Sequence, residues 1–270
     1  MIEEFKKRIK TLPPLPKSFQ KISEICDGDG SVGELSKAIE SDPMMVADML
    51  KTANSPLYGF NRQIKTVLQA VSLFGKSMTK ALIMNSTVQG MLKVSVEPYG
   101  VSPEQFVNIS NLQGAIAKAW FKRVAPDRAD DLFLCALLQD TGKILISDEV
   151  IKRDEVMYFK DDIAMNFDIG AVEMNNFNTT SILVAADIFD HWRFEANMVE
   201  NIRHSNDPKN APDEFKQMAW ALYIIRILAN QKQQLSELNV QTALNLAAQN
   251  GFDEQILKEV IKEIKDRNLQ

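Results

Sequence analysis

The sequence predicts an all-α protein, and three observations lead to that fold class. Apolar residues recur at intervals of three and four along most of the 270 residues, which is the spacing of one helix face. Helix-start signals precede several of these stretches. Alternating apolar and polar residues, which would indicate strands, are scarce, and no fixed-period repeat or low-complexity tract is present. With 45% hydrophobic and 25% charged residues, the chain has material for one large domain or two smaller ones.

The first predicted helices begin at Ser31 and Asp42. Ser31 is followed three residues later by Glu, the capping-box pattern in which a hydroxyl and a carboxylate accept from free backbone N–H groups. Asp42 precedes Pro43, so a capping carboxylate stands before a residue suited to the first helical turn. We expect this second helix to cover residues 44–53 and to stop before Pro56, because proline disfavours a helical residue before it.

Two more helices are predicted before residue 93. Apolar residues at helical spacing run from Ile64 to Val71, and Gly75 is placed to end this helix. Ser77 is then expected to cap a further helix that extends to about Leu92.

Residues 93–102 form the predicted hinge between two lobes. Pro98, Gly100 and Pro103 break helical continuity in and beside this segment. The sequence therefore predicts an N-terminal helical lobe over residues 1–93 and a C-terminal helical lobe over residues 102–270.

The C-terminal lobe is predicted to be a further series of helices. Ser102, followed by Pro and then by Gln three residues on, gives another helix start. A strongly apolar helix near residues 132–138 leads into the segment Gln-Asp-Thr-Gly-Lys at 139–143, after which apolar residues resume. The remaining predicted helices cover residues 180–192, 195–204, 213–231, 240–250 and 253–265.

The charge distribution disfavours nucleic acid as the main ligand. The chain carries 31 Lys and Arg against 36 Asp and Glu, a net charge of −5. Residues 1–100 carry 13 basic and 10 acidic residues, whereas residues 101–270 carry 18 and 26. Duplex-binding proteins usually have a strongly basic domain or stripe, and most of this chain would repel a phosphate backbone.

No membrane association is predicted. The N-terminal residues lack the basic start and apolar stretch of a signal peptide, and no apolar run reaches the length of about 18 residues that spans a membrane. The two cysteines, Cys26 and Cys135, lie in apolar helical stretches and are expected to be small buried hydrophobic residues. We therefore expect a cytoplasmic protein.

The common catalytic motifs are absent from the sequence. It contains no P-loop, no Gly-rich dinucleotide fingerprint, no nucleophile elbow and no Cys-x-x-Cys pair. With only two histidines, His191 and His204, a three-histidine zinc site is impossible.

Four segments resemble the HDOD domain family in their order and spacing. The resemblance is strongest over residues 12–90 and continues more weakly to about residue 205. The residues that carry it, for which we expect mainly structural roles, are Leu12, Pro13, Leu15, Pro16, Asp42, Pro43, Asn54, Ser55, Tyr58 and Gly75. The resemblance implies an all-α fold whose C-terminal lobe is similar to the HD-type metal-dependent phosphohydrolases.

HD enzymes use a His-Asp dyad and further His and Asp ligands to hold a divalent metal, which polarises the phosphoryl oxygen and activates a bound water. Their local pattern resembles Leu-Leu-His-Asp-Ile-Gly-Lys, and here Gln139 stands at the place of the dyad histidine, before Asp140. An amide is a poor replacement for imidazole on a transition metal.

The other ligand positions that the resemblance implies are also mostly lost. Residues 107–110 hold no histidine, and the downstream histidine falls at Ser181. His204 lies near a place where family members often carry a histidine pair. Asp140 and His204 give at most two ligands, so we expect no metal and no cofactor.

The retained residues at this position allow two interpretations. In the structural one, Asp140 caps or pairs with a nearby donor and Gly142 permits close approach of two helices. In the functional one, Gln139, Asp140, Lys143, Ser181 and His204 mark a vestigial pocket, in which Lys143 and His204 bind an anion or a nucleotide.

What the resemblance implies for function is a bacterial signal-transduction module without catalytic residues. Such a module would act by binding signalling or regulatory proteins. The alternative is a divergent HD-type phosphohydrolase that acts on a nucleotide or cyclic nucleotide and uses Asp140 and His204 with ligands that the pattern does not reveal.

Overall fold

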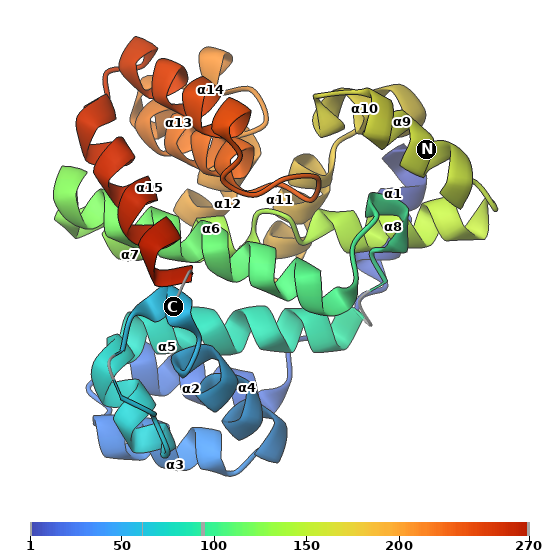
Figure 1. Ribbon diagram of the computed structural model, residues 1–270. Coiled ribbons are helices and arrows are strands. Elements are labelled where there is room, and N and C mark those ends of the chain that lie inside the picture. Colours follow the sequence, from blue (N-terminus) through green and yellow to red (C-terminus); the bar gives the residue numbers. More distant parts are fainter. Residues whose placement is uncertain (1, 61, 93–94, 269–270) are drawn as a thin grey trace. The chain divides into compact units, whose positions relative to one another are not determined.

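The computed structural model describes residues 2–60, 62–92 and 95–268, and it confirms the all-α prediction (Figure 1). These residues form a succession of helices, joined by turns and short 3-10 segments. The only pairing of strand type among them is an isolated bridge between Ala229 and Gln234. None of the helices in the described ranges combines the length and the apolar character needed to cross a membrane.

The chain divides into two compact units. The N-terminal unit holds residues 13–91 together with the stretch after residue 262, and the C-terminal unit holds the stretch up to residue 12 together with residues 92–262. The lobe boundaries expected from the sequence, 1–93 and 102–270, stay a prediction.

The helices of the N-terminal unit are α2 (Lys17–Asp27), α3 (Val32–Glu40), α4 (Pro43–Ala53), η1 (Pro56–Tyr58), α5 (Val67–Leu92, up to residue 91) and the end of α15 (Glu254–Asn268). Those of the C-terminal unit before residue 166 are α1 (Ile2–Lys10), η2 (Glu97–Tyr99), α6 (Pro103–Val124), η3 (Pro126–Arg128), α7 (Ala129–Leu138), α8 (Gly142–Lys152) and α9 (Val156–Met165). After it come α10 (Ile169–Phe177), α11 (Ser181–His191), α12 (Ala196–His204), η4 (Pro208–Asn210), α13 (Asp213–Leu228), α14 (Glu237–Gln249) and most of α15.

The predicted helix starts are confirmed by their capping bonds. At α3, the backbone N–H of Ser31 donates to Glu34 Oε2 at 2.7 Å, and the Glu34 N–H donates back to Ser31 Oγ at 3.2 Å. At α4, Asp42 Oδ1 accepts from the Met44 N–H at 2.9 Å, with Pro43 in the first turn. A second capping box opens α6 at Ser102.

Gly75 breaks α5 into two segments. Its φ of 75° and ψ of 174° lie outside the helical region, while the residues on either side are helical. The predicted helix end at Gly75 is therefore confirmed. The predicted cap at Ser77 is wrong, because Ser77 has helical dihedrals and already lies inside the second segment.

Helix α13 ends earlier than predicted. It stops at Leu228 rather than near residue 231, and Ala229 is no longer helical, with a φ of −135° and a ψ of 82°. The carbonyl of Ala229 accepts a hydrogen bond from the side chain of Gln113 at 2.7 Å. This tertiary contact and the bridge to Gln234 take the chain out of the helix, and neither is visible in local sequence.

Three α-helices of the C-terminal unit were not predicted, α1, α9 and α10, nor were the bounds of α2 in the N-terminal unit. The predicted hinge is only partly described, since Lys93 and Val94 lie outside the described residues. Of its remainder, Val96 and Tyr99 are buried. The Tyr99 ring packs edge-on against Phe159 of α9 at 5.4 Å between centroids. Val96, Pro98 and Tyr99 thus belong to the core of the C-terminal unit, while Glu97 is exposed.

Candidate functional site

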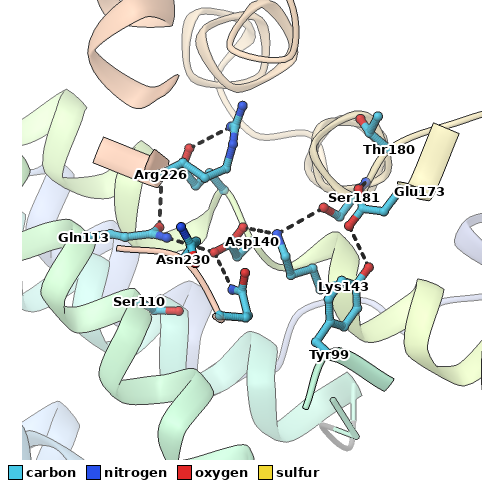
Figure 2. Close-up of polar contacts among 12 residues, drawn as sticks. Tyr99, Ser110, Gln113, Asp140, Lys143, Glu173, Thr180, Ser181, Arg226 and Asn230 are labelled. Carbon is cyan, nitrogen blue, oxygen red and sulfur yellow. Dashed lines mark hydrogen bonds and ion pairs between the residues drawn. The ribbon is translucent and has the colours of Figure 1, made fainter. Parts of the chain in front are cut away.

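Four of the predicted vestigial positions lie together in the interior of the C-terminal unit (Figure 2). Helix α7 ends at Leu138, and a short turn then places Gln139 and Asp140 before α8 begins at Gly142. Ser181 is the first residue of α11. We name this group the buried polar centre; it consists of Tyr99, Gln113, Gln139, Asp140, Lys143, Glu173, Ser181, Arg226 and Gln231.

Asp140 is the acceptor at the middle of the centre, and it is 1% exposed. Its Oδ1 accepts from Lys143 Nζ at 2.5 Å. Its Oδ2 accepts from two amides, Gln113 Nε2 and Gln231 Nε2, each at 2.9 Å. Both carboxylate oxygens are therefore occupied by donors of the chain itself.

The pKa of Asp140 lies below its usual value. Burial alone favours the protonated acid, but the charge of Lys143 and its hydrogen bond, with smaller contributions from Gln231 and Arg226, outweigh that effect. The carboxyl group is thus an anion held by an internal cation.

Gln139 joins the amide side of the centre to an arginine. Its Nε2 donates to Gln113 Oε1 at 3.0 Å, and its Oε1 accepts from Arg226 Nη1 at 3.2 Å. Arg226 Nη2 also donates to the backbone carbonyl of Ser205 at 2.9 Å. The residue at the place of the dyad histidine therefore has both its donor and its acceptor engaged.

Lys143 connects Asp140 to the start of α11, as Figure 2 shows. Its Nζ lies 3.3 Å from Ser181 Oγ and 5.6 Å from the centroid of the Tyr99 ring. The Ser181 N–H donates to Glu173 Oε2 at 2.6 Å, and the Tyr99 hydroxyl donates to Glu173 Oε1 at 2.7 Å. Burial, followed by the charge of Glu173, raises the pKa of Tyr99 well above its usual value, so the hydroxyl stays a donor.

Gly142 lets α8 and α11 touch backbone to backbone. A Cβ on this residue would lie 1.9 Å from the Ser181 carbonyl oxygen and 2.8 Å from the Ala185 nitrogen. The expectation that Gly142 permits a close helix approach is confirmed. The approach also fixes Ser181 beside Lys143.

His204 makes its described contacts away from the centre. Its Nε2 lies 3.4 Å from Glu200 Oε2, and its ring stacks on Phe215 with centroids 5.2 Å apart. None of these contacts involves Asp140 or Lys143. Residues 107–110 cover another ligand position at which this chain has no histidine. There, Ser110 Oγ donates to the Phe106 carbonyl at 3.2 Å. The described contacts of Lys143 and His204 therefore do not join these two residues in one pocket.

The residues present do not fit the metal of the HD enzymes. The described ranges contain no group of three or more His, Cys, Asp or Glu side chains placed to hold a metal ion. Asp140 has no oxygen free of donors, and the amide of Gln139, at the place of the dyad histidine, is engaged on both sides.

The family motif residues of the N-terminal unit hold local structure. Asn54 Nδ2 donates to the carbonyls of Leu50 and Ile64, and its Oδ1 accepts from the Ile64 N–H, at 2.8, 2.9 and 2.8 Å. Asn54 therefore ties the end of α4 to the chain ten residues on. The half-buried Tyr58 ring packs edge-on against Phe74, with centroids 5.0 Å apart.

The remaining motif residues stand at turns. Ser55 precedes η1 and its carbonyl accepts from the Tyr58 N–H at 3.2 Å. The Leu12 N–H donates to the Ile9 carbonyl just after α1, and Pro13 follows. The Leu15 carbonyl accepts from the Gln20 side chain, and Pro16 directly precedes α2.

Sequence reasoning missed Tyr99, Gln113, Glu173, Arg226 and Gln231 as members of the centre. Each is brought to Asp140 or its partners from a distant part of the chain, 27 residues away for Gln113 and 91 for Gln231. No local pattern marks such residues. The one available signal is polarity on an apolar face, as at Glu173 beside buried Val172.

Comparison with known proteins places these features in a family. A protein of Treponema pallidum (strain Nichols), whose function is uncharacterised, is 23% identical over 238 residues, which are 82% of this chain and 43% of that protein. The chain thus spans less than half the length of this relative.

Two solved structures are similar over nearly the whole chain. One is a virulence factor from Campylobacter jejuni subsp. jejuni, with 26% identity, a TM-score of 0.60 and coverage of 99% of this chain and 100% of the other. The second, from Shewanella amazonensis SB2B, carries the provisional name of phosphohydrolase; it has 20% identity, a TM-score of 0.74 and coverage of 98% and 97%. The second likeness shows the fold alone.

The match to a family model covers most of both units. Residues 12–208 match the model of the HDOD domain, and they include every motif residue from Leu12 to Gly75 as well as Asp140, Lys143 and Ser181. Because this match extends over more than half of the sequence, the chain belongs to the HDOD domain family.

Proposed function

We propose that this chain is a non-catalytic regulatory module, which acts in cytoplasmic signal transduction by binding a protein partner. Membership of the HDOD family supports the signalling part of the proposal. One observation carries the non-catalytic part: both oxygens of Asp140 accept hydrogen bonds from Lys143, Gln113 and Gln231.

The donors around Asp140 support the same proposal. The HD pattern also carries a Lys at the place of Lys143, so the pairing of this ammonium with Asp140 does not by itself separate the chain from an HD enzyme. What separates it is the amide pair of Gln113 and Gln231 on Asp140 Oδ2 and the loss of the ligand histidines. Gln139 offers an amide that is already engaged on both sides.

The second candidate function is a divergent HD-type phosphohydrolase. The provisional name of the Shewanella protein and the retained Asp140 favour it. Such an enzyme would contain a bound metal or would hydrolyse a phosphate ester, and both the metal content and the hydrolysis can be measured directly.

The test is the metal content of the purified, untagged chain, read by elemental mass spectrometry after dialysis, together with hydrolysis of bis(p-nitrophenyl) phosphate and of cyclic nucleotides with added Mn²⁺. We expect far less than one metal per chain and no hydrolysis above the buffer rate. Removing the Asp140 carboxylate also destabilises the fold, so His204→Ala is the variant of choice, with Asp213→Ala at a fully exposed carboxylate as the matched control.

Near-stoichiometric metal, or hydrolysis that falls in His204→Ala and not in Asp213→Ala, would overturn the proposal in favour of the phosphohydrolase. A metal-free chain without hydrolysis, whose two variants behave alike, supports the regulatory module.

A further inference from the structure

Helices α9 and α10 carry a cluster of exposed apolar side chains. Met157, Tyr158 and Met165 of α9 are 71%, 80% and 84% exposed. Phe167, in the turn between the helices, is 62% exposed, and Met174 of α10 is also exposed. We name these five residues the α9–α10 surface.

This cluster is not the ordinary scatter of apolar residues over a protein surface. Among the described residues, ten large apolar side chains are exposed, and six of them lie between Ile151 and Met174. Single exposed apolar residues need no explanation, but a group from one short stretch of chain marks an interaction site. Three of the five are methionines, whose flexible side chains adapt to the shape of a partner.

The geometry of α9 aligns part of the cluster into a stripe. Tyr158 and Met165 are seven residues apart, so they lie on the same side of the helix, about 10 Å apart along its axis. Phe167 follows two residues after the helix ends. A helix of two or three turns presents an apolar stripe of matching length.

The surface is held in place from its inner side. The Phe159 ring packs against Tyr99 and Phe177 at centroid distances of 5.4 and 5.7 Å. The Lys232 ammonium donates to the carbonyls of Ile163, Ala164 and Asn166, at 2.8, 3.0 and 2.9 Å, where α9 ends. A partner would therefore meet a preformed surface and lose less entropy on binding.

The polar residues around the surface are mostly acidic. Within residues 154–178 the exposed charged side chains are carboxylates, contributed by Asp154, Glu155, Asp161, Asp162 and Asp168. The one basic residue in this stretch, Lys160, is half-buried and pairs with Glu97 at 3.1 Å. The exposed charges of α9, α10 and the turn between them are thus negative, while Lys232 adds one ammonium where α9 ends and Lys152 precedes the stretch.

We propose that the α9–α10 surface binds a basic amphipathic helix of a partner protein. This inference rests on the proposed function, since it names the chemistry of the protein partner. The apolar stripe takes the apolar face of such a helix, and the carboxylates attract its Lys and Arg residues. A second copy of the chain would oppose the same carboxylates to one another across a two-fold axis. Anionic lipid and nucleic acid would be repelled.

The probe is a panel of synthetic peptides of about 18 residues, or five helical turns, built from Leu and Lys with the Leu residues on one helix face. Peptides of the same composition with scrambled order, and peptides with Glu in place of Lys, are the ligand controls. Binding is followed by titration calorimetry at about 50 and 500 mM salt, because screening separates the charge contribution from the apolar one. We expect the amphipathic Lys peptides alone to bind, and more weakly at high salt.

Two variants locate the binding on the surface. The double substitution Met165→Ser and Phe167→Ser is expected to weaken binding about tenfold or more, and Asp161→Lys several-fold at low salt only. Leu238→Ser removes an equally exposed apolar residue of α14, at 60% exposure, and is expected to bind like the unchanged chain.

Equal binding of the scrambled peptides, no binding by any peptide of the panel, or equal binding by the double variant would overturn the assignment of this surface. Self-association or vesicle binding that the double variant abolishes would also overturn it, in favour of a second copy or a membrane. None of these results changes the metal and hydrolysis measurements, so a failure of this inference is distinguishable from a failure of the proposed function.

Discussion

At the scale of single residues, Gly142 is a position where one added carbon has a large effect. A Cβ there would meet the Ser181 carbonyl oxygen at 1.9 Å, and backbone atoms of a packed helix cannot move aside easily. We expect Gly142→Ala to lower the free energy of unfolding by roughly 3 kcal/mol or more, or to prevent folding. Gly90→Ala is the control, because Gly90 lies within α5 with open space around it and should gain about 0.5–1 kcal/mol. Similar denaturant midpoints for both variants would contradict the close approach.

The pairing of Asp140 with Lys143 predicts a compensating double variant. Lys143→Met leaves a buried carboxylate without its ammonium and should cost about 3–5 kcal/mol, and Asp140→Asn leaves the ammonium unpaired. The combined Asp140→Asn and Lys143→Met variant removes both charges and keeps an amide oxygen for Gln113 and Gln231. We expect it to be more stable in urea than the Lys143→Met single variant. Additive losses would show that the two charges are independent.

The lowered pKa of Asp140 predicts how this stabilisation depends on pH. The folded-state pKa of Asp140 lies below its unfolded-state value of about 3.9. The stabilisation from the ionised carboxylate is therefore complete at pH values above about 3.9, and it is lost as pH falls through the folded-state pKa. We expect the stability difference between the unchanged chain and Asp140→Asn to be constant from about pH 7 to 5 and to shrink below about pH 4. Urea unfolding across this range measures it, and a difference that grows toward acid pH would contradict the sign.

At the scale of elements, the end of α4 depends on one amide. Asn54 makes three hydrogen bonds to Leu50 and Ile64, and two of them satisfy the backbone C=O and N–H of Ile64, which is buried. We expect Asn54→Ala to cost about 3 kcal/mol in urea unfolding. Asn54→Asp keeps the acceptor for the Ile64 N–H but places a carboxylate oxygen against the carbonyls of Leu50 and Ile64, so it should cost at least as much as Asn54→Ala. Equal stability of Asn54→Ala and the unchanged chain would show that the loop closes without this residue.

The elements that could be predicted from sequence are those whose cause is local. Ser31, Asp42 and Ser102 cap helices through bonds to residues two or three positions away, and Gly75 ends a helix through its own dihedrals. The end of α13 could not be predicted, because the bond from Gln113 to Ala229 joins residues 116 positions apart.

The same distinction holds for the candidate site. Gln139, Asp140 and Lys143 could be identified because they stand in one short motif, and Ser181 because the resemblance places the downstream histidine of the HD enzymes there. Arg226, Glu173 and Gln231 join them only when the helices pack. One of the two interpretations placed Lys143 and His204 in one pocket; this stays a prediction, and the described contacts of His204 are to Glu200 and Phe215.

At the scale of the whole molecule, the net charge of −5 predicts behaviour toward polyanions. Residues 101–270 carry most of the excess negative charge, so duplex DNA should be repelled rather than bound. We expect no retention on immobilised duplex DNA at about 50 mM salt, and retention on an anion exchanger that decreases with salt. Retention on DNA that is lost with increasing salt would reveal a basic patch that the overall charge conceals.

The long separations within the buried polar centre also have a consequence for folding kinetics. Asp140 and Lys143 are three residues apart, but the bonds to Gln231 and from Arg226 to Gln139 join residues 91 and 87 positions apart. During synthesis, Asp140 therefore leaves the ribosome long before its donor Gln231 exists, and Gln139 long before its donor Arg226. Contacts of such high sequence separation form late, since loop closure must precede them. Until then the segment from α6 to α8 has its apolar packing, the ion pairs of Lys118 with Asp130 and of Lys143 with Asp140, and the bonds of Gln113 to Asp140 and Gln139. The remaining polar bonds of the centre are completed only when residues 226–231 dock.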